Sequence, residues 1–199
     1  MHTNIKFSVI IPSYLGNYNG CATNRKYKLE RAINSVLNQT YKDFEIIVIA
    51  DGCKDTVYLC REIEDKRLRV VSINKRPVFS GEVRNTGLRF AKGNYIIYLD
   101  SDDMYEPDHM ERIAEKLDDY DWVFFNDSQF NGTKYPQNNT LTFGSAKTSN
   151  ICHKNGLEVK WTDGYQHDFE FIKQLMNYSY KHIGDSGYLV CHVPDLIDY

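Results

Sequence analysis

The sequence predicts an α/β fold with a mostly parallel central sheet and crossover helices, and three observations support this prediction. Short apolar, β-branched runs alternate with segments of helical period through the first two-thirds of the chain, which is typical of such a sheet. Several of these runs end in polar residues or glycine, as strands do where a sheet binds ligands. The 199 residues are 42% hydrophobic and 26% charged, which describes a soluble globular chain long enough for one such domain.

The strands and helices can be placed in order along this part of the chain. We expect five strands, at 7–11, 44–50, 68–73, 95–99 and 122–125. Two helices are indicated by apolar residues on one helical face, Leu29, Ala32, Ile33, Val36 and Leu37 in the first and Met110, Ile113, Ala114 and Leu117 in the second. The segments "KDTVYLCREIED" and "GEVRNTGLRFAKG" predict two more helices, and Gly93 at the end of the latter suits a C-cap.

The last third of the chain differs from the rest in composition and periodicity. From Asn126 the segment "NDSQFNGTKYPQNNTLTFGSAKTSN" is polar and weakly periodic, so we expect a hairpin or loops there. A short helix at "HDFEFIKQLMNY" and a tail with apolar pieces follow. The chain shows no internal repeat and no linker, so we expect a single domain over residues 1–199.

Composition excludes several classes of function. A formal net charge of -3 argues against a general nucleic-acid binder, which needs clustered excess Lys and Arg. The chain has no P-loop and no G-x-G-x-x-G motif. Five cysteines without a C-x-x-C pair favour a reducing interior, and we expect a cytoplasmic location. No signal peptide and no run near the ~20 apolar residues of a membrane span is present.

Polar side chains follow three of the expected strands. The first strand ends in "PSY" (12–14), the second in "ADG" (50–52) and the fourth in "DSDD" (100–103). If these strands are parallel, all three ends lie on one edge of the sheet. Asp100 and Asp102 are two residues apart, so in an extended segment both would face one cation.

A divalent cation would account for this concentration of negative charge. Mg²⁺ or Mn²⁺ prefers carboxylate oxygens together with substrate phosphates, and it would act as a Lewis acid on a diphosphate leaving group. The alternative is that these carboxylates cap the helix that begins near residue 107. Arg84, near a helix start, could point at phosphate or be a solvated charge.

Taken together, "FSVIIPSY", "SVLNQTYKDFEIIVIADGCKD" and "RNTGLRFAKGNYIIYLDSDD" resemble the family 2 glycosyltransferases over roughly residues 6–127. The resemblance implies a Rossmann-like GT-A fold and an inverting transfer from a nucleotide diphosphate sugar, most often a UDP-sugar, to a glycan or other hydroxyl acceptor. It also implies Mn²⁺ or Mg²⁺ at the D-x-D motif, a nucleotide-sugar-binding half at 1–127, and an acceptor side at 128–199. A place within a larger glycan-assembly system is compatible with it.

The resemblance implies donor contacts at six positions, Pro12, Tyr14, Asp51, Arg84, Asp100 and Ser101. Tyr14 would stack on the base, and Asp51 would hydrogen-bond it, usually as uracil. Asp100 would contact the ribose or the metal, and Asp102 would bind the metal directly. The chain departs from the family after Tyr14, where "LGNYNGCATNRKYK" replaces a short turn.

The resemblance also implies a general base, which takes the proton of the acceptor hydroxyl. In "YQHDFEFIKQL" Asp168 takes that position, with His167 where the family usually has Glu; a helix N-cap is the alternative role for Asp168. His192 matches a histidine that often supplies a further metal ligand, with His182 as the second choice. Trp161 and Asp163 could line the acceptor site, although packing explains Trp161 equally well.

Three other functions stay open at this point. A sugar-1-phosphate nucleotidyltransferase would carry a basic Gly-rich loop after the first strand, and "PSYLGNYNG" has no basic residue. A phosphohydrolase usually has its D-x-D on the first strand. A non-catalytic nucleotide-sugar or glycan-binding module would keep the donor edge and would not need Asp168.

Overall fold

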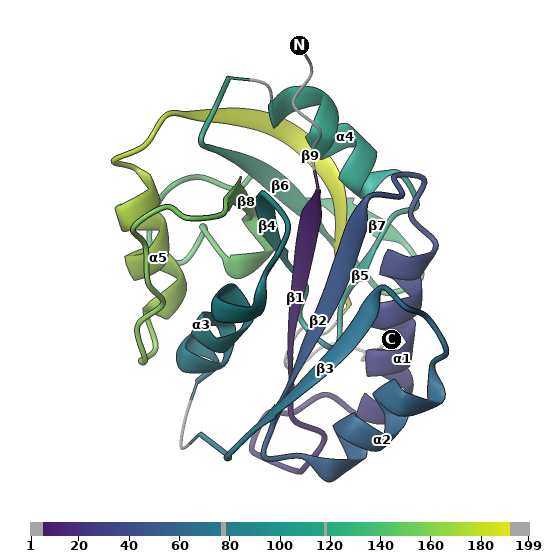
Figure 1. Ribbon diagram of the computed structural model, residues 1–199. Helices are drawn as coiled ribbons and strands as arrows, with labels where there is room; N and C mark the ends of the chain where they lie inside the picture. The colour runs from purple at the N-terminus through teal and green to yellow at the C-terminus, as the bar shows by residue number, and fades with distance from the viewer. Residues whose placement is uncertain (1–5, 77–78, 118, 192–199) are drawn as a thin grey trace.

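The computed structural model describes residues 6–76, 79–117 and 119–191. Within these residues nine strands form one sheet (Figure 1). Its first part is parallel and has the order β3-β2-β1-β4, built from β1 (Phe7–Ser13), β2 (Phe44–Asp51), β3 (Leu68–Ile73) and β4 (Tyr95–Tyr98). The sequence predicted these four strands, and their parallel pairing is confirmed.

Helices cover both faces of this parallel part. On one face, α1 (Arg25–Leu37), α2 (Lys54–Glu62) and α4 (His109–Leu117) pack on a core of alternate strand residues that includes Val9, Ile46 and Ile97. On the other face, α3 (Gly81–Phe90) and α5 (His167–Leu175) pack on the intervening residues, such as Ile10 and Ile96. The two groups of helices lie on opposite sides of the sheet in Figure 1.

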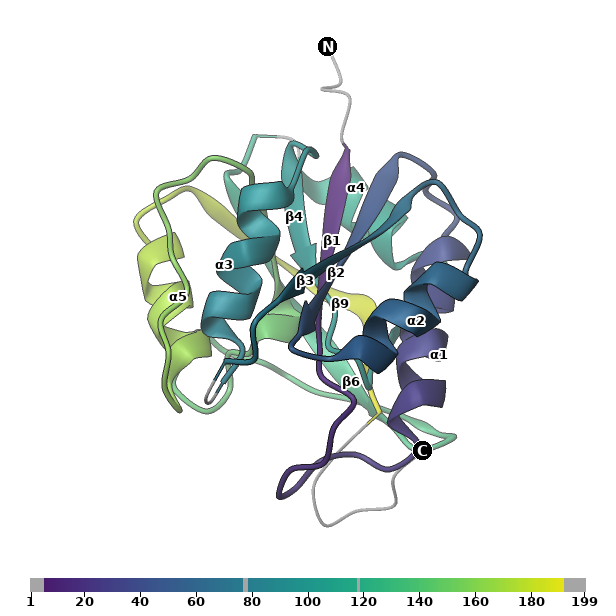
Figure 2. The same ribbon diagram turned by 60° about the horizontal axis from the view of Figure 1, so that its bottom comes forward.

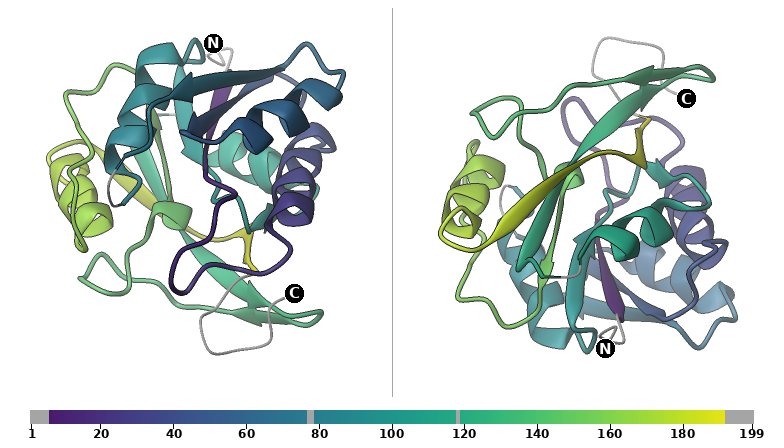
Figure 3. Two further views of the ribbon diagram at one scale, coloured as in Figure 1. Left: turned by 90° about the horizontal axis from the view of Figure 1, so that it is seen from below. Right: turned by 90° about the horizontal axis from the view of Figure 1, so that it is seen from above.

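The sheet continues through strands that the sequence predicts only in part. Its order beyond β4 is β8 (Ile151–Lys154), β6 (Trp122–Phe130), β9 (Tyr180–Val190) and β5 (Met104–Tyr105). β8 is antiparallel to both β4 and β6, and β9 runs parallel to β6. The long curve of β9 beside β6 is visible in Figure 3. The expected hairpin is formed by β6 and β7 (Lys134–Pro136).

The glycine after α3 has a different role from the predicted C-cap. The helix ends at Phe90 and its cap residue is Ala91. A Cβ on Gly93 would lie 2.5 Å from the carbonyl oxygen of Lys6. Glycine is therefore needed at this position because the backbone passes close to the start of β1.

None of the helices in the described ranges combines the length and the apolar character that crossing a bilayer requires.

Candidate active site

The carboxyl ends of β1, β2 and β4 meet at one edge of the sheet. Ser13 pairs with Ala50, and Ile10 pairs with Tyr98, so the residues that follow each strand are neighbours. Figure 2 shows this edge, with the loop between β1 and α1 projecting from it. The sequence prediction that Tyr14, Asp51 and the acidic cluster share an edge follows from this register.

The acidic cluster is a turn, not the extended segment that we expected. β4 ends at Tyr98, and the backbone N–H of Asp103 donates to the carbonyl of Asp100 at 3.1 Å. Asp and Ser are favoured in such turns because their side chains hydrogen-bond nearby backbone groups. The alternation argument for Asp100 and Asp102 was therefore wrong.

Asp103, the third acid of the turn, is buried and holds the end of β9. Its carboxylate accepts the Tyr188 hydroxyl at 2.9 Å and the backbone N–H of Cys191 at 2.8 Å. Burial, followed by the charges of Asp102 and Asp100, raises the pKa of Asp103 well above its usual range. Asp103 therefore acts as an anchor of the turn.

Basic residues of α1 approach the turn from the opposite side. Arg31 donates to the carbonyl oxygen of Asp102 at 2.6 Å. Lys28 is buried, and burial and then the neighbouring Arg31 lower its pKa, while the charges of Asp102 and Asp103 raise it. These cations offset part of the repulsion among the carboxylates.

Arg84 connects the acidic turn to the other side of the site. It is buried on α3, and its guanidinium donates to Asp100 at 2.7 Å and to the Ser80 hydroxyl. The guanidinium also lies 5.0 Å from the ring of Trp161. Within the described residues, Nε of Arg84 is buried without a hydrogen-bond partner, so one donor of this guanidinium is unsatisfied.

The candidate base Asp168 is reached from Arg84 through His167. Nη1 of Arg84 lies 3.3 Å from Nε2 of His167, and this nitrogen lies 3.2 Å from a carboxylate oxygen of Asp168. Nδ1 of His167 pairs with the carbonyl of Gly164 at 2.8 Å. His167, which stands in place of the expected Glu, lies between Arg84 and Asp168. Its Nε2 can accept from Arg84 or donate to Asp168, but not both at once.

A second contact to Asp168 comes from Thr148, which the sequence did not single out. Its hydroxyl donates to the carboxylate oxygen that also faces His167. The residues on either side of Thr148 are fixed on the fully buried Asp127, which accepts Ser149 at 2.9 Å and Lys147 at 3.2 Å. Alternate side chains of this short segment thus bind two different carboxylates, and together they position Asp168.

At the other end of the site, Lys75 lies between the two residues predicted to bind the base. Its ammonium nitrogen is 2.7 Å from Asp51 and 4.4 Å from the centroid of the Tyr14 ring. The backbone N–H of Arg76 donates to the second oxygen of Asp51 at 2.7 Å. Tyr14 and Asp51 are therefore brought together, and Lys75 covers one face of the ring. Pro12 lies half-buried in β1, opposite Ile49.

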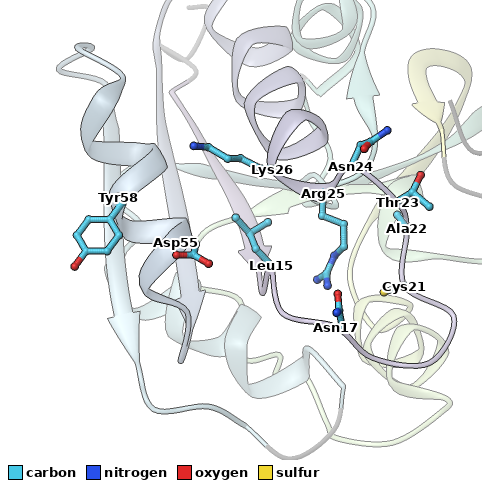
Figure 4. Close-up of a pocket in the computed structure, with 10 residues that line it drawn as sticks. All are labelled: Leu15, Asn17, Cys21, Ala22, Thr23, Asn24, Arg25, Lys26, Asp55 and Tyr58. Atoms are coloured by element: carbon cyan, nitrogen blue, oxygen red, sulfur yellow. The ribbon is translucent and has the colours of Figure 1, made fainter.

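The inserted segment after Tyr14 forms a pocket of about 500 Å³ with the starts of α1 and α2 (Figure 4). Leu15, Cys21, Asp55 and Tyr58 are among its lining residues. Arg25 holds the segment in place, since its guanidinium donates to the carbonyl of Gly16 and lies 4.7 Å from the Tyr18 ring.

Three residues that the sequence predicts as donor or metal ligands remain to be placed. Ser101 is half-buried within the acidic turn, and His192 lies outside the described residues. His182 pairs with Asn126 at 3.0 Å and packs its ring on Phe124, so its side chain connects β9 to β6.

Trp161 and Asp163, the two residues predicted to line the acceptor site, both contact other parts of the protein. The side chain of Trp161 is buried and stacks on Phe171 at 3.9 Å between centroids, so the packing explanation holds. Asp163 accepts the backbone N–H of Glu82 at 3.3 Å, in the first turn of α3.

Two carboxylates, Asp100 and Asp102, remain as donors for a divalent cation. Within the described part of the chain no three His, Cys, Asp or Glu side chains are arranged around a common metal position. The side chain of Asp100 is 37% exposed and one of its oxygens pairs with Arg84. One or two carboxylates completed by phosphate oxygens and water are a usual arrangement around Mg²⁺, and the residues present fit it.

Comparison with solved structures defines the fold. The crystal structure of S. aureus TarS 1–349 in complex with UDP-GlcNAc matches with a TM-score of 0.76 and 20% identity, over 94% of this chain and 58% of that one. Mannosyltransferase PcManGT from Pyrobaculum calidifontis, in complex with GDP-Man and Mn²⁺, matches with a TM-score of 0.71 and 16% identity, over 97% and 58%. The fold is that of a GT-A glycosyltransferase.

Sequence comparison then identifies the family. The model of Glycosyl transferase family 2 matches residues 8–179, and the chain belongs to that family. Glycosyltransferase GlyA of Streptococcus pneumoniae serotype 4 is 34% identical over 117 residues, 58% of this chain and 15% of that protein. The Escherichia coli UDP-Glc:alpha-D-GlcNAc-diphosphoundecaprenol beta-1,3-glucosyltransferase WfgD is 34% identical over 112 residues, 56% of this chain and 38% of that protein. The chain thus spans well under half the length of these relatives.

Family membership confirms the predicted resemblance to the family 2 glycosyltransferases. The nucleotidyltransferase and phosphohydrolase alternatives are thereby set aside.

Proposed function

We propose that this domain is a metal-dependent, inverting glycosyltransferase that moves a sugar from a UDP-sugar to a hydroxyl group of a glycan or glycoconjugate. The observation that carries the proposal is the contact series Asp100–Arg84–His167–Asp168. It brings a candidate base for the acceptor within reach of the groups that would hold the donor. A site for one-step displacement needs both at once.

The donor end is built from Tyr14, Asp51 and Arg84. Uracil would stack on Tyr14 and donate its N–H to Asp51, which keeps acceptor capacity beside Lys75 because each carboxylate oxygen has two lone pairs. Arg84, through its hydrogen bond to Asp100, would place positive charge near the diphosphate. Similar proteins support the choice of base, since the TarS structure is a complex with UDP-GlcNAc and WfgD is named for UDP-Glc.

Asp102 and Asp100 would hold the divalent cation. When bound, it supplies positive charge at the oxygens of the leaving diphosphate. The Mn²⁺ in the PcManGT complex supports this choice of metal.

Asp168 would carry out the proton transfer. Its carboxylate takes the proton of the acceptor hydroxyl while that oxygen bonds to the anomeric carbon, and the bond from that carbon to the diphosphate oxygen breaks with its electron pair. One displacement of this kind inverts the anomeric configuration. Thr148 donates to this carboxylate and His167 lies beside it, so both would fix its orientation at the first turn of α5.

The test is thermal stability and nucleoside diphosphate release with a panel of UDP-, GDP- and dTDP-sugars, with Mn²⁺ and with EDTA. We expect stabilisation and slow hydrolytic release with a UDP-sugar only when Mn²⁺ is present. Equal stabilisation in EDTA would refute the metal dependence, and preference for a GDP-sugar would refute the assignment of the base.

A further inference from the structure

Three aromatic rings gather on the surface next to the candidate base. Tyr165 is 81% exposed and Phe143 is 53% exposed. The centroid of the Phe143 ring lies 6.5 Å from that of Tyr165 and 6.0 Å from that of Phe169, in edge-to-face arrangements. We name Phe143, Tyr165 and Phe169 the aromatic platform. A cluster of exposed apolar rings on a protein surface marks a binding site more often than single exposed rings do.

Two other exposed aromatic side chains, those of Tyr18 and Tyr180, are partly covered by neighbours. Tyr18 lies under the guanidinium of Arg25 at 4.7 Å, and Tyr180 stacks on the buried Trp122 at 4.8 Å. Phe169 has such a neighbour too, since Lys173 is 5.5 Å from its ring. Phe143 and Tyr165 contact only other rings of the platform among the ring and cation contacts described. Packing on the rest of the protein therefore does not explain why these two rings are exposed together.

The platform is attached to Asp168 from two directions. Phe169 follows Asp168 on α5, and Tyr165 precedes it by three residues. Phe143 belongs to the segment that leads to Thr148, whose hydroxyl binds Asp168. His167 and Arg84 connect Asp168 to the donor carboxylates instead. Asp168 thus adjoins the platform along the chain and approaches the donor carboxylates through His167 and Arg84.

An acceptor must place one hydroxyl at the base, so its body lies on the surface beside Asp168 that the donor does not use. A pyranose with equatorial hydroxyls has one face of C–H groups, and these fit the negative faces of aromatic rings. The Tyr165 hydroxyl adds a hydrogen-bonding group at the edge of the platform. The charged side chains of Glu170 and Lys173, paired at 2.7 Å, lie on the same helix.

We propose that Phe143, Tyr165 and Phe169 bind the acceptor sugar, a pyranose of glucose-like configuration, by stacking on its C–H face. This proposal rests on the proposed function for the role of Asp168. It adds the chemical class of the acceptor and the residues that select it.

Binding can be tested without any turnover by saturation-transfer NMR on the full chain. The two probes are methyl β-D-glucopyranoside and sorbitol, which offers similar hydroxyls without a ring face. We expect saturation of the glucoside protons H1, H3 and H5, and none of sorbitol. Phe143→Ala and Tyr165→Ala should each weaken glucoside binding about fivefold to tenfold, whereas Tyr165→Phe should retain most of it. Tyr27→Ala, at a tyrosine of α1 that is 63% exposed, is the matched control and should bind as the parent does.

Steady-state kinetics provides a second test of the platform. With a working acceptor, the platform variants should raise the acceptor KM and leave kcat and the hydrolysis of the donor by water near parent values. Three results would overturn the proposal that the platform binds the acceptor sugar. The Phe143→Ala/Tyr165→Ala double variant could bind the glucoside as the parent does. Sorbitol could bind as strongly as the glucoside, or the parent could give no glucoside signal. Donor stabilisation by UDP-sugars is measured separately, so failure of the platform and failure of the proposed function give different results.

Discussion

The donor edge and the acceptor side of this sheet hold their functional groups in different ways. Tyr14, Asp51 and Asp100 follow parallel strands, and the register of β1, β2 and β4 alone brings them together. Asp168 instead depends on side-chain contacts from Thr148 and His167. The backbone therefore sets the positions of the donor groups, whereas the position of the base depends on polar side-chain contacts.

The largest effect is expected at the base itself. Asp168→Asn keeps an oxygen to accept the Thr148 hydroxyl and loses the ability to take a proton, so kcat should fall by ~10²–10⁴. Donor Kd and thermal stability should stay near parent values. Turnover with a working acceptor and calorimetry with the donor measure the two quantities.

Glu170→Gln on the same helix, where the native side chain pairs with Lys173, is the matched control and should keep parent activity. Full activity in Asp168→Asn would show that Asp168 is not the base; it is not the helix N-cap either, since α5 begins at His167 with Gln166 as its N-cap. The search for the base would then turn to His167 and Asp163.

The second prediction concerns the donor edge. Asp102→Ala should abolish the Mn²⁺-dependent stabilisation by UDP, which at a hundredfold excess over Kd amounts to about 3 kcal/mol. The fold should persist because a repelling charge is removed. Melting temperatures with UDP, in Mn²⁺ and in EDTA, test this.

Asp108→Ala, which removes a carboxylate paired with Arg112 at 2.8 Å, should retain the Mn²⁺-dependent stabilisation by UDP. The metal assignment is wrong if UDP protects the Asp102→Ala protein as well as the parent.

Acid should weaken the acceptor side through His109, which joins α4 to β9. Its Nδ1 pairs with the carbonyl of Ser186 at 2.7 Å, and burial lowers its pKa to about 3. Because the unfolded chain takes up this proton near pH 6.5 and the folded chain resists it, the contribution of His109 to stability is complete above pH 6.5 and is lost as pH falls toward 3. Between pH 7 and pH 5 the loss should be about 2 kcal/mol.

Urea unfolding at pH 7, 6 and 5 measures this slope. His109→Gln should flatten it, and His182→Gln, at an exposed position of β9, should leave it unchanged. An identical slope in His109→Gln and the parent would contradict the assignment.

The smallest effect is expected at the base-binding end. Asp51→Asn replaces an acceptor that faces Lys75 and the proposed uracil N–H, so UDP affinity should fall by about 1 kcal/mol, roughly fivefold. Asp55→Asn, four residues along the chain in α2, is the control. Calorimetry with UDP and GDP is the measurement, and equal affinity of the parent for both nucleotides would remove the uracil assignment.

The same contrast explains what could be predicted from the sequence. The four parallel strands are continuous apolar runs, and their ends share an edge by topology, so the meeting of Tyr14, Asp51 and Asp100 could be foreseen. The turn at 100–103 could also have been found, since "DSDD" is rich in residues that favour turns.

The sequence of the acceptor side predicts its strands and side-chain contacts less clearly. β9 contains Gly184 and Gly187, and its pairing with β6 shifts register on either side of Asn126, so it lacks the regular alternation of a strand. Thr148 and Lys75 act through contacts with residues that are 20 and 24 positions away, at Asp168 and Asp51. No local pattern encodes such a pairing. His167 was noticed only because it replaces an expected Glu.

The position of Trp161 beneath Arg84 gives this domain an internal optical reporter. The indole lies 5.0 Å from the guanidinium and donates to the Tyr98 hydroxyl at 3.1 Å, so its emission depends on the local electric field. A cation and diphosphate bound at Asp100, which pairs with Arg84, would change that field. The other tryptophan, Trp122, stacks on Tyr180, and in a Trp122→Phe protein the fluorescence of one residue would follow donor binding in real time without a label.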